Sequence, residues 1–256
     1  MKLTGFKLIL VIILFAAALS VIAISEFTEI MPSEYTGGII SRLFAAACFI
    51  AIAAILHGVK LRVNPYEGAK DRKLRALLIA AMFVICVNNA PLIGLLSGNV
   101  VITASADRIF LYLFYCFSVA LFEEVLFRCV LLETFFVIAG DNIRNKFLAL
   151  FISALIFSLS HFDGFNFNVM IQMGYTFLLG VGWGYIAMKE GHILWGIAMH
   201  FLYNAGGMAA QIAEGNRWDT ATVIITALLS VAVGAVYLYS MVKDIINSNT
   251  PPVRPA

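Results

Sequence analysis

The sequence is poor in charged side chains, which supply 12% of its 256 residues, whereas apolar side chains supply 62%. Soluble proteins contain about 25% charged and about 45–50% apolar residues. This shortage of charge excludes an ordinary cytosolic domain. The net charge of +2 is too small to indicate nucleic-acid binding, so no nucleic-acid partner is expected.

The sequence also lacks paired cysteines. Its four cysteines are Cys48, Cys86, Cys116 and Cys129, and no two of them form a CxxC pair. A disulfide framework and a thiolate zinc site are therefore not indicated, and we expect these residues to pack within helices. The alternating pattern of membrane β-strands is missing as well, which leaves helices as the elements that cross the bilayer.

The chain does contain a series of apolar runs of about twenty residues, the length that spans a hydrocarbon core of about 30 Å. These runs predict an all-α fold, a polytopic membrane helix bundle of about eight transmembrane helices. The predicted spans are 8–25, 39–58, 74–97, 108–137, 147–162, 168–188, 192–213 and 220–242.

Basic residues gather in one loop, between the second and third predicted spans. Loops rich in Lys and Arg stay in the cytoplasm, so this loop is predicted to be cytoplasmic. An even number of spans then places both termini in the cytoplasm. We expect a multi-pass protein in contact with the lipid of a bacterial cytoplasmic membrane. The basic residues of the loop are Lys60, Arg62, Lys70, Arg72, Lys73 and Arg75.

Three charges interrupt the fourth predicted span, at Glu123, Glu124 and Arg128. A charge at the centre of a membrane helix costs about 2.5–3.5 kcal/mol, so these side chains are expected to face a partner or water. Glu124 and Arg128 are four residues apart on one helix face, where they can form an ion pair. Glu123 points about 100° away. It either pairs with a polar group of another helix to hold the bundle together, or carries out chemistry.

Two histidines and an amide lie on other spans: His161 ends the fifth, and His200 and Asn204 share one face of the seventh. A single histidine in a membrane helix is more often a packing residue, but this set together with a carboxylate pair suits hydrolysis. Glu123 is the candidate general base, and His161 could orient the water that Glu123 deprotonates. His200 and Asn204 could donate hydrogen bonds to the oxyanion of a tetrahedral intermediate.

At these residues the sequence resembles the CPBP family, also called the Abi family, which includes the type II CAAX prenyl proteases and bacteriocin-processing enzymes. The family motifs EExxxR, FxxxH and HxxxN occur in order, as Glu123-Glu124 with Arg128, Phe157 with His161, and His200 with Asn204. The resemblance implies an intramembrane endopeptidase that hydrolyses a hydrophobic or lipidated peptide.

In this family the first glutamate and the first histidine are regarded as activating water, and the second histidine and the asparagine as an oxyanion hole. Glu124 is counted with the catalytic residues, and Arg128 is expected to form an ion pair or to bind substrate. On this basis residues 1–107 form N-terminal helices, 108–213 the catalytic helices, and 214–256 the last helix and a short tail.

Several alternatives remain open. Zinc could be bound by Glu123, His161 and His200 with a water in the fourth position. However, the sequence lacks the HExxH motif, and we expect no metal cofactor. A non-catalytic membrane scaffold or immunity protein of the same fold is a second alternative. A proton-coupled transporter is a third, although it predicts internal repeats that the sequence does not display. The sequence does not indicate an oligomeric state.

The predicted span boundaries raise a geometric question about the site. They place His161 more than about 20 Å from the cytoplasmic end of its helix, at a rise of about 1.5 Å per residue, and His200 nearer that end. The three motifs can therefore meet only if helices tilt or break, or if the boundaries lie elsewhere.

Overall fold

The computed structural model describes residues 5–27, 34–58, 63, 71–140, 142–215 and 220–248, which form a helical bundle. The all-α class predicted from the sequence is confirmed. The longer helices are α1 (Gly5–Phe27), α2 (Glu34–His57), α3 (Arg72–Asn88), α5 (Ala106–Glu124), α7 (Ile143–Leu159), α8 (Phe167–Glu190), α9 (Leu194–Gly207) and α10 (Thr220–Ser248).

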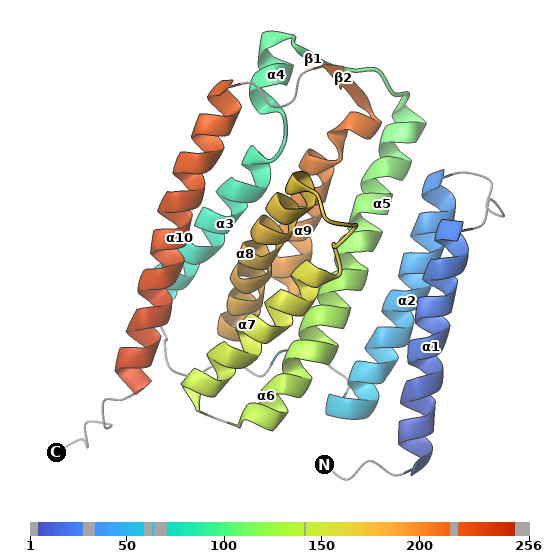
Figure 1. Cartoon of the computed structure of the whole chain (residues 1–256), viewed down its shortest axis with the longest axis vertical. Coiled ribbons are helices and arrows are strands. Elements are labelled where there is room, and N and C mark those ends of the chain that lie inside the picture. Colours follow the sequence, from blue (N-terminus) through green and yellow to red (C-terminus); the bar gives the residue numbers. More distant parts are fainter. Residues whose placement is uncertain are drawn as a thin grey trace.

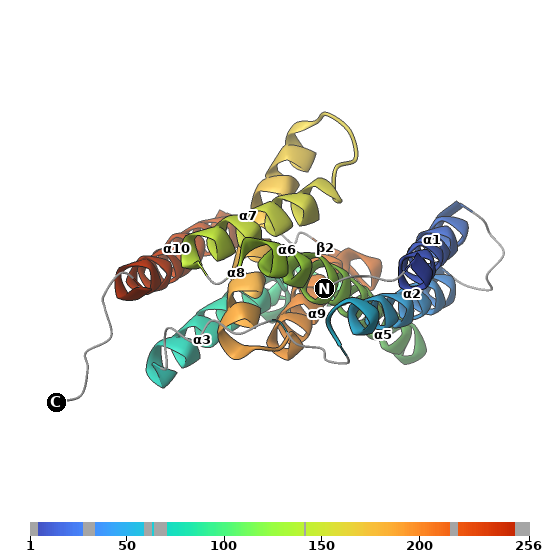
Figure 2. The same cartoon turned by 90° about the horizontal axis from the view of Figure 1, so that it is seen from below.

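The central helices α5, α8 and α9 lie between two flanking groups (Figures 1 and 2). On one side α2 packs against α5 and carries α1 on its outer face. On the other side α3 packs against α9 and α10. Large apolar side chains cover the outside of this bundle, among them Phe6, Phe110 and Leu228. Such a surface suits contact with acyl chains.

Five helical stretches in the described part of the chain are long and apolar enough to cross a membrane: Gly5–Ser25, Tyr35–His57, Ala106–Ala139, Phe167–Glu190 and Thr220–Ser248. The helices α3, α7 and α9 coincide with the other predicted spans but contain only 17, 17 and 14 residues. An integral membrane protein is therefore supported, while the predicted number of eight crossings stays a prediction.

Two predicted spans end differently in the structure. The span 74–97 is divided into α3 and the short helix α4 (Leu92–Ser97), because Pro91 lacks the backbone N–H that a continuous helix requires. The span 192–213 is helical only to Gly207, and a 3₁₀ turn, η2 (Ala209–Gln211), follows it.

A short antiparallel pair of strands accompanies the helices. β1 (Val100–Ile102) pairs with β2 (Ala213–Gly215), with Val101 opposite Glu214. The pair lies at one end of the bundle, beyond the long helices (Figure 1). Strands are excluded from lipid because their edges remain unpaired there, and this restriction does not apply outside the hydrocarbon core.

The fourth predicted span, 108–137, forms one continuous helical rod. It consists of α5, the π-helical segment η1 (Val125–Leu132) and α6 (Glu133–Ala139). π-Helical turns inside longer helices occur often at functional sites. Here the π segment begins directly after Glu124, between the two carboxylates and Arg128.

Candidate functional site

Glu124 and Arg128 form the buried ion pair that their spacing predicts. Arg128 Nε lies 3.2 Å from Glu124 Oε2, and both side chains are completely buried. The guanidinium also lies over the ring of Phe157, with its central carbon 5.3 Å from the ring centroid. Two charges in a membrane interior are tolerated at this place because each one has a partner.

His200 connects the two carboxylates across the α5–α9 interface. Its Nδ1 lies 3.2 Å from Glu124 Oε1, and its Nε2 lies 3.4 Å from Glu123 Oε2. The imidazole is 3% exposed, whereas the Glu123 side chain is 17% exposed. Within the described part of the chain, Glu123 Oε2 is buried without a hydrogen bond. Glu124 is thus held from two sides, and Glu123 keeps acceptor capacity and some access to solvent.

Gly196 allows α9 to approach the buried carboxylate. A Cβ atom at this position would lie 2.6 Å from Glu124 Oε2. Gly196 is four residues before His200 and therefore shares its helix face. The absence of a side chain at Gly196 and the imidazole of His200 together shape the side of α9 that Glu124 contacts.

His161 lies beside the same aromatic ring as His200. The ring of Phe157 is 4.9 Å from the ring of His161 and 5.9 Å from that of His200, between centroids. The helix α7 runs obliquely to α5 (Figure 1), and this tilt brings its far end toward the other motifs. The helix α7 spans Ile143–Leu159 against the predicted 147–162, and the two histidine motifs meet at the ring of Phe157.

The tautomer of His161 follows from its hydrogen bond to the backbone. Its Nδ1 lies 2.9 Å from the carbonyl oxygen of Phe157, which can only accept a hydrogen bond. The proton of a neutral imidazole is therefore on Nδ1, and Nε2 is an acceptor. The half-buried ring of His161 can accept a proton or a hydrogen bond from water.

Asn204 is half-buried one turn beyond His200 on α9, and its amide makes no hydrogen bond to any described residue. The backbone around it is held firmly. Asn89 Nδ2 donates to the carbonyl of Tyr203 at 2.7 Å, and Tyr112 Oη donates to that of Ala205 at 2.6 Å. The structure thus brings the two glutamates, Arg128 and His200 together. His161 lies beside the ring of Phe157, which also lies beside His200. The Asn204 side chain is one helical turn from His200.

Comparison with known proteins identifies the segment that carries these residues. Residues 105–206 match the family described as type II CAAX prenyl endopeptidase Rce1-like. This segment is Rce1-like. The match confirms the resemblance noted in the sequence. It supports a CAAX-type intramembrane protease. No curated protein and no solved structure matches the chain.

Trp183 is a residue of the Rce1-like segment that the sequence motifs did not indicate. Its ring stacks on the imidazole of His200, with centroids 4.3 Å apart and an interplanar angle of 22°. Its signal in the sequence is its place among the small residues Gly180, Gly182 and Gly184, which permit close helix approach. Gly180 does lie against Ala154 and Phe157 of α7.

A metal centre finds no ready ligand set in the Rce1-like segment. Within the described ranges, no three His, Cys, Asp or Glu side chains are arranged to hold one metal ion. Among the suggested zinc ligands, His200 lies against Glu123 and Glu124, and the rings of His161 and His200 both lie beside the ring of Phe157. We derive no chemical step through a metal.

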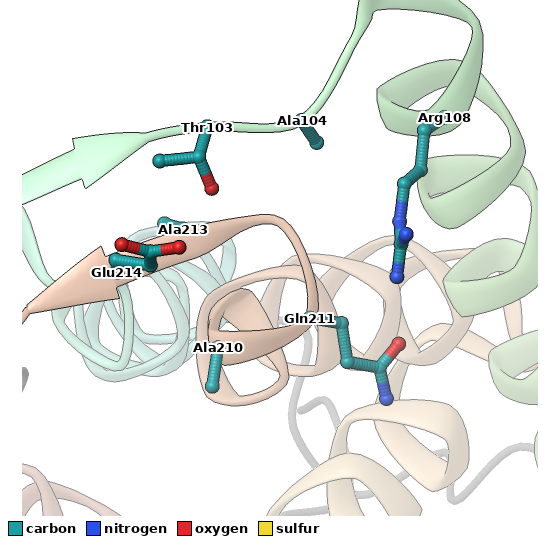
Figure 3. Close-up of a pocket in the computed structure, with 7 residues that line it drawn as sticks. All are labelled: Thr103, Ala104, Arg108, Ala210, Gln211, Ala213 and Glu214. Atoms are coloured by element: carbon teal, nitrogen blue, oxygen red, sulfur yellow. The ribbon is translucent and has the colours of Figure 1, made fainter.

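A cavity of about 260 Å³ lies at the opposite end of α5 from the glutamate pair. Figure 3 shows its walls, which come from β2, η2 and the start of α5. None of the candidate catalytic residues lines it. Its lining residues are Thr103, Ala104, Arg108, Ala210, Gln211, Ala213 and Glu214.

Proposed function

We propose that this chain is an intramembrane endopeptidase that hydrolyses a hydrophobic or lipidated peptide with a water activated by Glu123. The observation that carries the proposal is the position of His200 between two unequal carboxylates. One of them, Glu124, is fully buried and neutralised by Arg128, whereas the Glu123 side chain is 17% exposed and its buried Oε2, 3.4 Å from His200 Nε2, makes no hydrogen bond within the described part of the chain. A general base needs a carboxylate with spare acceptor capacity and a route by which water can reach the side chain.

In the proposed reaction, Glu123 takes one proton from water, and the resulting hydroxide adds to the carbonyl carbon of the scissile peptide bond. The tetrahedral intermediate then collapses, and its C–N bond breaks. Glu123 returns the proton to the amine that leaves. General acid–base catalysis of this kind contributes about two to four orders of magnitude in rate.

His200 and Asn204 are assigned to the oxyanion. The oxyanion role needs an imidazolium: a His200 ring with a proton on each nitrogen would donate from Nδ1 to Glu124 and present Nε2–H on the Glu123 side of the site. Nε2–H and the Asn204 amide can then both donate to the oxyanion, and one donor of this type is worth about two to three orders of magnitude. His161, with Nε2 as an acceptor, orients the attacking water.

The substrate is proposed from the family of the matched segment. Rce1-like proteins are described as CAAX prenyl endopeptidases. The first probe is therefore a peptide that ends in a farnesylated cysteine followed by three residues. The same peptide without the farnesyl group distinguishes a need for the lipid from a need for a hydrophobic sequence alone.

The test uses purified full-length protein in liposomes and product analysis by mass spectrometry. We expect the wild-type protein to release a carboxyl-terminal fragment, and Glu123→Gln to reduce the rate by at least about a hundredfold. Glu214→Gln is the matched control, because Glu214 is an exposed carboxylate on β2, away from the site. Equal rates for wild type and Glu123→Gln would refute the proposal. Absence of cleavage from every probe would favour the scaffold alternative.

A chelation experiment on the same preparation addresses the zinc alternative. We expect the cleavage rate to persist after prolonged treatment with a strong zinc chelator followed by dialysis. Loss of the rate on chelation and its return with added Zn²⁺ would instead assign the water to a metal.

A further inference from the structure

Trp183 covers one face of His200 inside the bundle. The two rings are nearly parallel, with centroids 4.3 Å apart, and both side chains are buried. Trp183 belongs to α8, so it approaches His200 from a helix that carries none of the candidate catalytic residues. The edge of the His200 ring is contacted from α5, where the two glutamates face the imidazole nitrogens.

The Trp183 ring is itself held by aromatic contacts. It meets the ring of Phe157 at 6.3 Å and that of Tyr203 at 6.1 Å, both edge-to-face. Within the described part of the chain the indole N–H has no nitrogen or oxygen acceptor, and the thiol of the buried Cys86 is its polar neighbour. A leucine would fill this space without burying an N–H group, so a packing role alone does not require a flat aromatic ring at this position.

The plane of a histidine ring needs support from its surroundings. The terminal torsion of histidine has a broad energy profile, so the backbone of α9 fixes the position of His200 but not the rotation of its ring. A flat partner at stacking distance restricts that rotation. With Trp183 in place, Nδ1 is directed at Glu124 and Nε2 at Glu123.

We infer that Trp183 is a positioning residue, which fixes the ring plane of His200 so that its two nitrogens face the two glutamates. This inference rests on the proposed peptidase function. It assigns a role to α8, the helix between the second and third motifs. The role is exerted through His200, and Trp183 needs no contact with the substrate.

Steady-state kinetics separate positioning from packing. We expect Trp183→Leu to lower kcat by about ten- to a hundredfold, the size of effect that misplacement of a reacting group produces, with KM changed less than about twofold. Trp183→Phe retains a flat ring and is expected to recover most of kcat. Trp195→Leu is the matched control, because Trp195 is an exposed tryptophan on α9. An unchanged kcat in Trp183→Leu would overturn the inference, and so would a Trp183→Phe variant as impaired as Trp183→Leu.

Tryptophan fluorescence gives a second readout that does not depend on activity. The chain has three tryptophans, so Trp195→Phe with Trp218→Phe leaves Trp183 as the sole emitter. In this background we expect His200→Gln to change the emission of Trp183, and His161→Gln to leave it nearly unchanged. If the emission of Trp183 were the same with and without His200→Gln, the inference would be overturned even in an active peptidase. A clear response to His200→Gln in a protein that cleaves no peptide would refute the proposed function and leave the ring contact established.

Discussion

Glu123 and Glu124 are neighbours in the chain, but their surroundings give them different capacities. Glu124 accepts hydrogen bonds from Arg128 and His200 and is completely buried. Glu123 is partly exposed and lies near the other nitrogen of the same imidazole. One carboxylate is therefore suited to orient His200, and the other to react with water.

Removal of Arg128 should mainly lower the stability of the fold. Arg128→Met leaves Glu124 as an unpaired buried charge, and breaking a buried pair in this way costs about 3–5 kcal/mol. We expect a lower unfolding temperature in detergent. The double variant Glu124→Gln with Arg128→Met should regain much of that stability and remain inactive. A double variant as unstable as the single one would contradict this view of the pair.

Gly196 should be sensitive to the addition of one methyl group. Gly196→Ala places a Cβ atom 2.6 Å from Glu124 Oε2, so the carboxylate or α9 has to move. We expect at least about a tenfold loss of peptide cleavage, because displacement of a reacting group by about 1 Å costs about a hundredfold. Gly174→Ala on α8 is the control, since its added Cβ meets nothing within 4 Å. Full activity in Gly196→Ala would show that Glu124 is not held where we place it.

At the residue scale, the sequence predicted local relations and missed those that depend on packing. The Glu124–Arg128 pair follows from a spacing of four within one helix, and the structure contains it. The contact of His200 with both glutamates depends on how α9 packs against α5. The stacking of Trp183 depends on the rotation of α8. No spacing within a single helix encodes either of these contacts.

At the scale of elements, α10 lies outside the Rce1-like segment but is tied to it by a buried polar network. Asp244 is completely buried and lies 2.6 Å from Lys189 Nζ of α8, and Tyr185 Oη donates to it at 2.7 Å. In addition, Tyr237 Oη donates to the carbonyl of Leu78 on α3. These bonds fix α10 against the helices that carry Trp183 and Asn89.

Two neighbouring positions on α10 provide a test of this attachment. Asp244→Ala leaves Lys189 buried without its carboxylate and should cost about 3–5 kcal/mol of unfolding free energy. Lys243→Ala removes only the basic partner of Asp71 in an exposed pair, so it should hardly change the unfolding free energy. Thermal unfolding of both variants in the same detergent makes the comparison. Equal shifts would mean that the buried network does not hold α10.

The sequence predicted the positions of some helices better than the breaks and tilts of others, for physical reasons. Continuous apolar runs marked α1, α2, α8 and α10 well, because lipid requires an uninterrupted apolar helix. The span 74–97 was predicted as one run, but the chain breaks after α3, where Asn88 and Asn89 donate hydrogen bonds to α10 and α9. The tilt of α7 was not predicted, since it is set by packing against neighbours and not by composition.

At the scale of the whole molecule, the start of α1 and the end of α10 lie at the same end of the bundle (Figure 1). The β1–β2 pair lies at the other end. This arrangement agrees with an even number of crossings, whereas the cytoplasmic side of the termini stays a prediction. Taken together with that prediction, it places β2 on the opposite side of the membrane.

Cysteine labelling in intact cells tests this orientation. We expect a membrane-impermeant maleimide to label Glu214→Cys from outside, and Ser248→Cys only after the membrane is opened. The native cysteines are all buried and should remain unlabelled. Labelling of Ser248→Cys from outside, with Glu214→Cys protected, would reverse the orientation.

The central claim is that Glu123 directs a water molecule onto a peptide carbonyl, and isotope transfer tests it most directly. The protein is incubated with the farnesylated peptide in water enriched in ¹⁸O, and single-turnover products are analysed by mass spectrometry. The account predicts one ¹⁸O atom in the newly formed carboxyl group with the wild-type protein, and no such product above background with Glu123→Gln. Cleavage without ¹⁸O, or equal incorporation by both proteins, would contradict it.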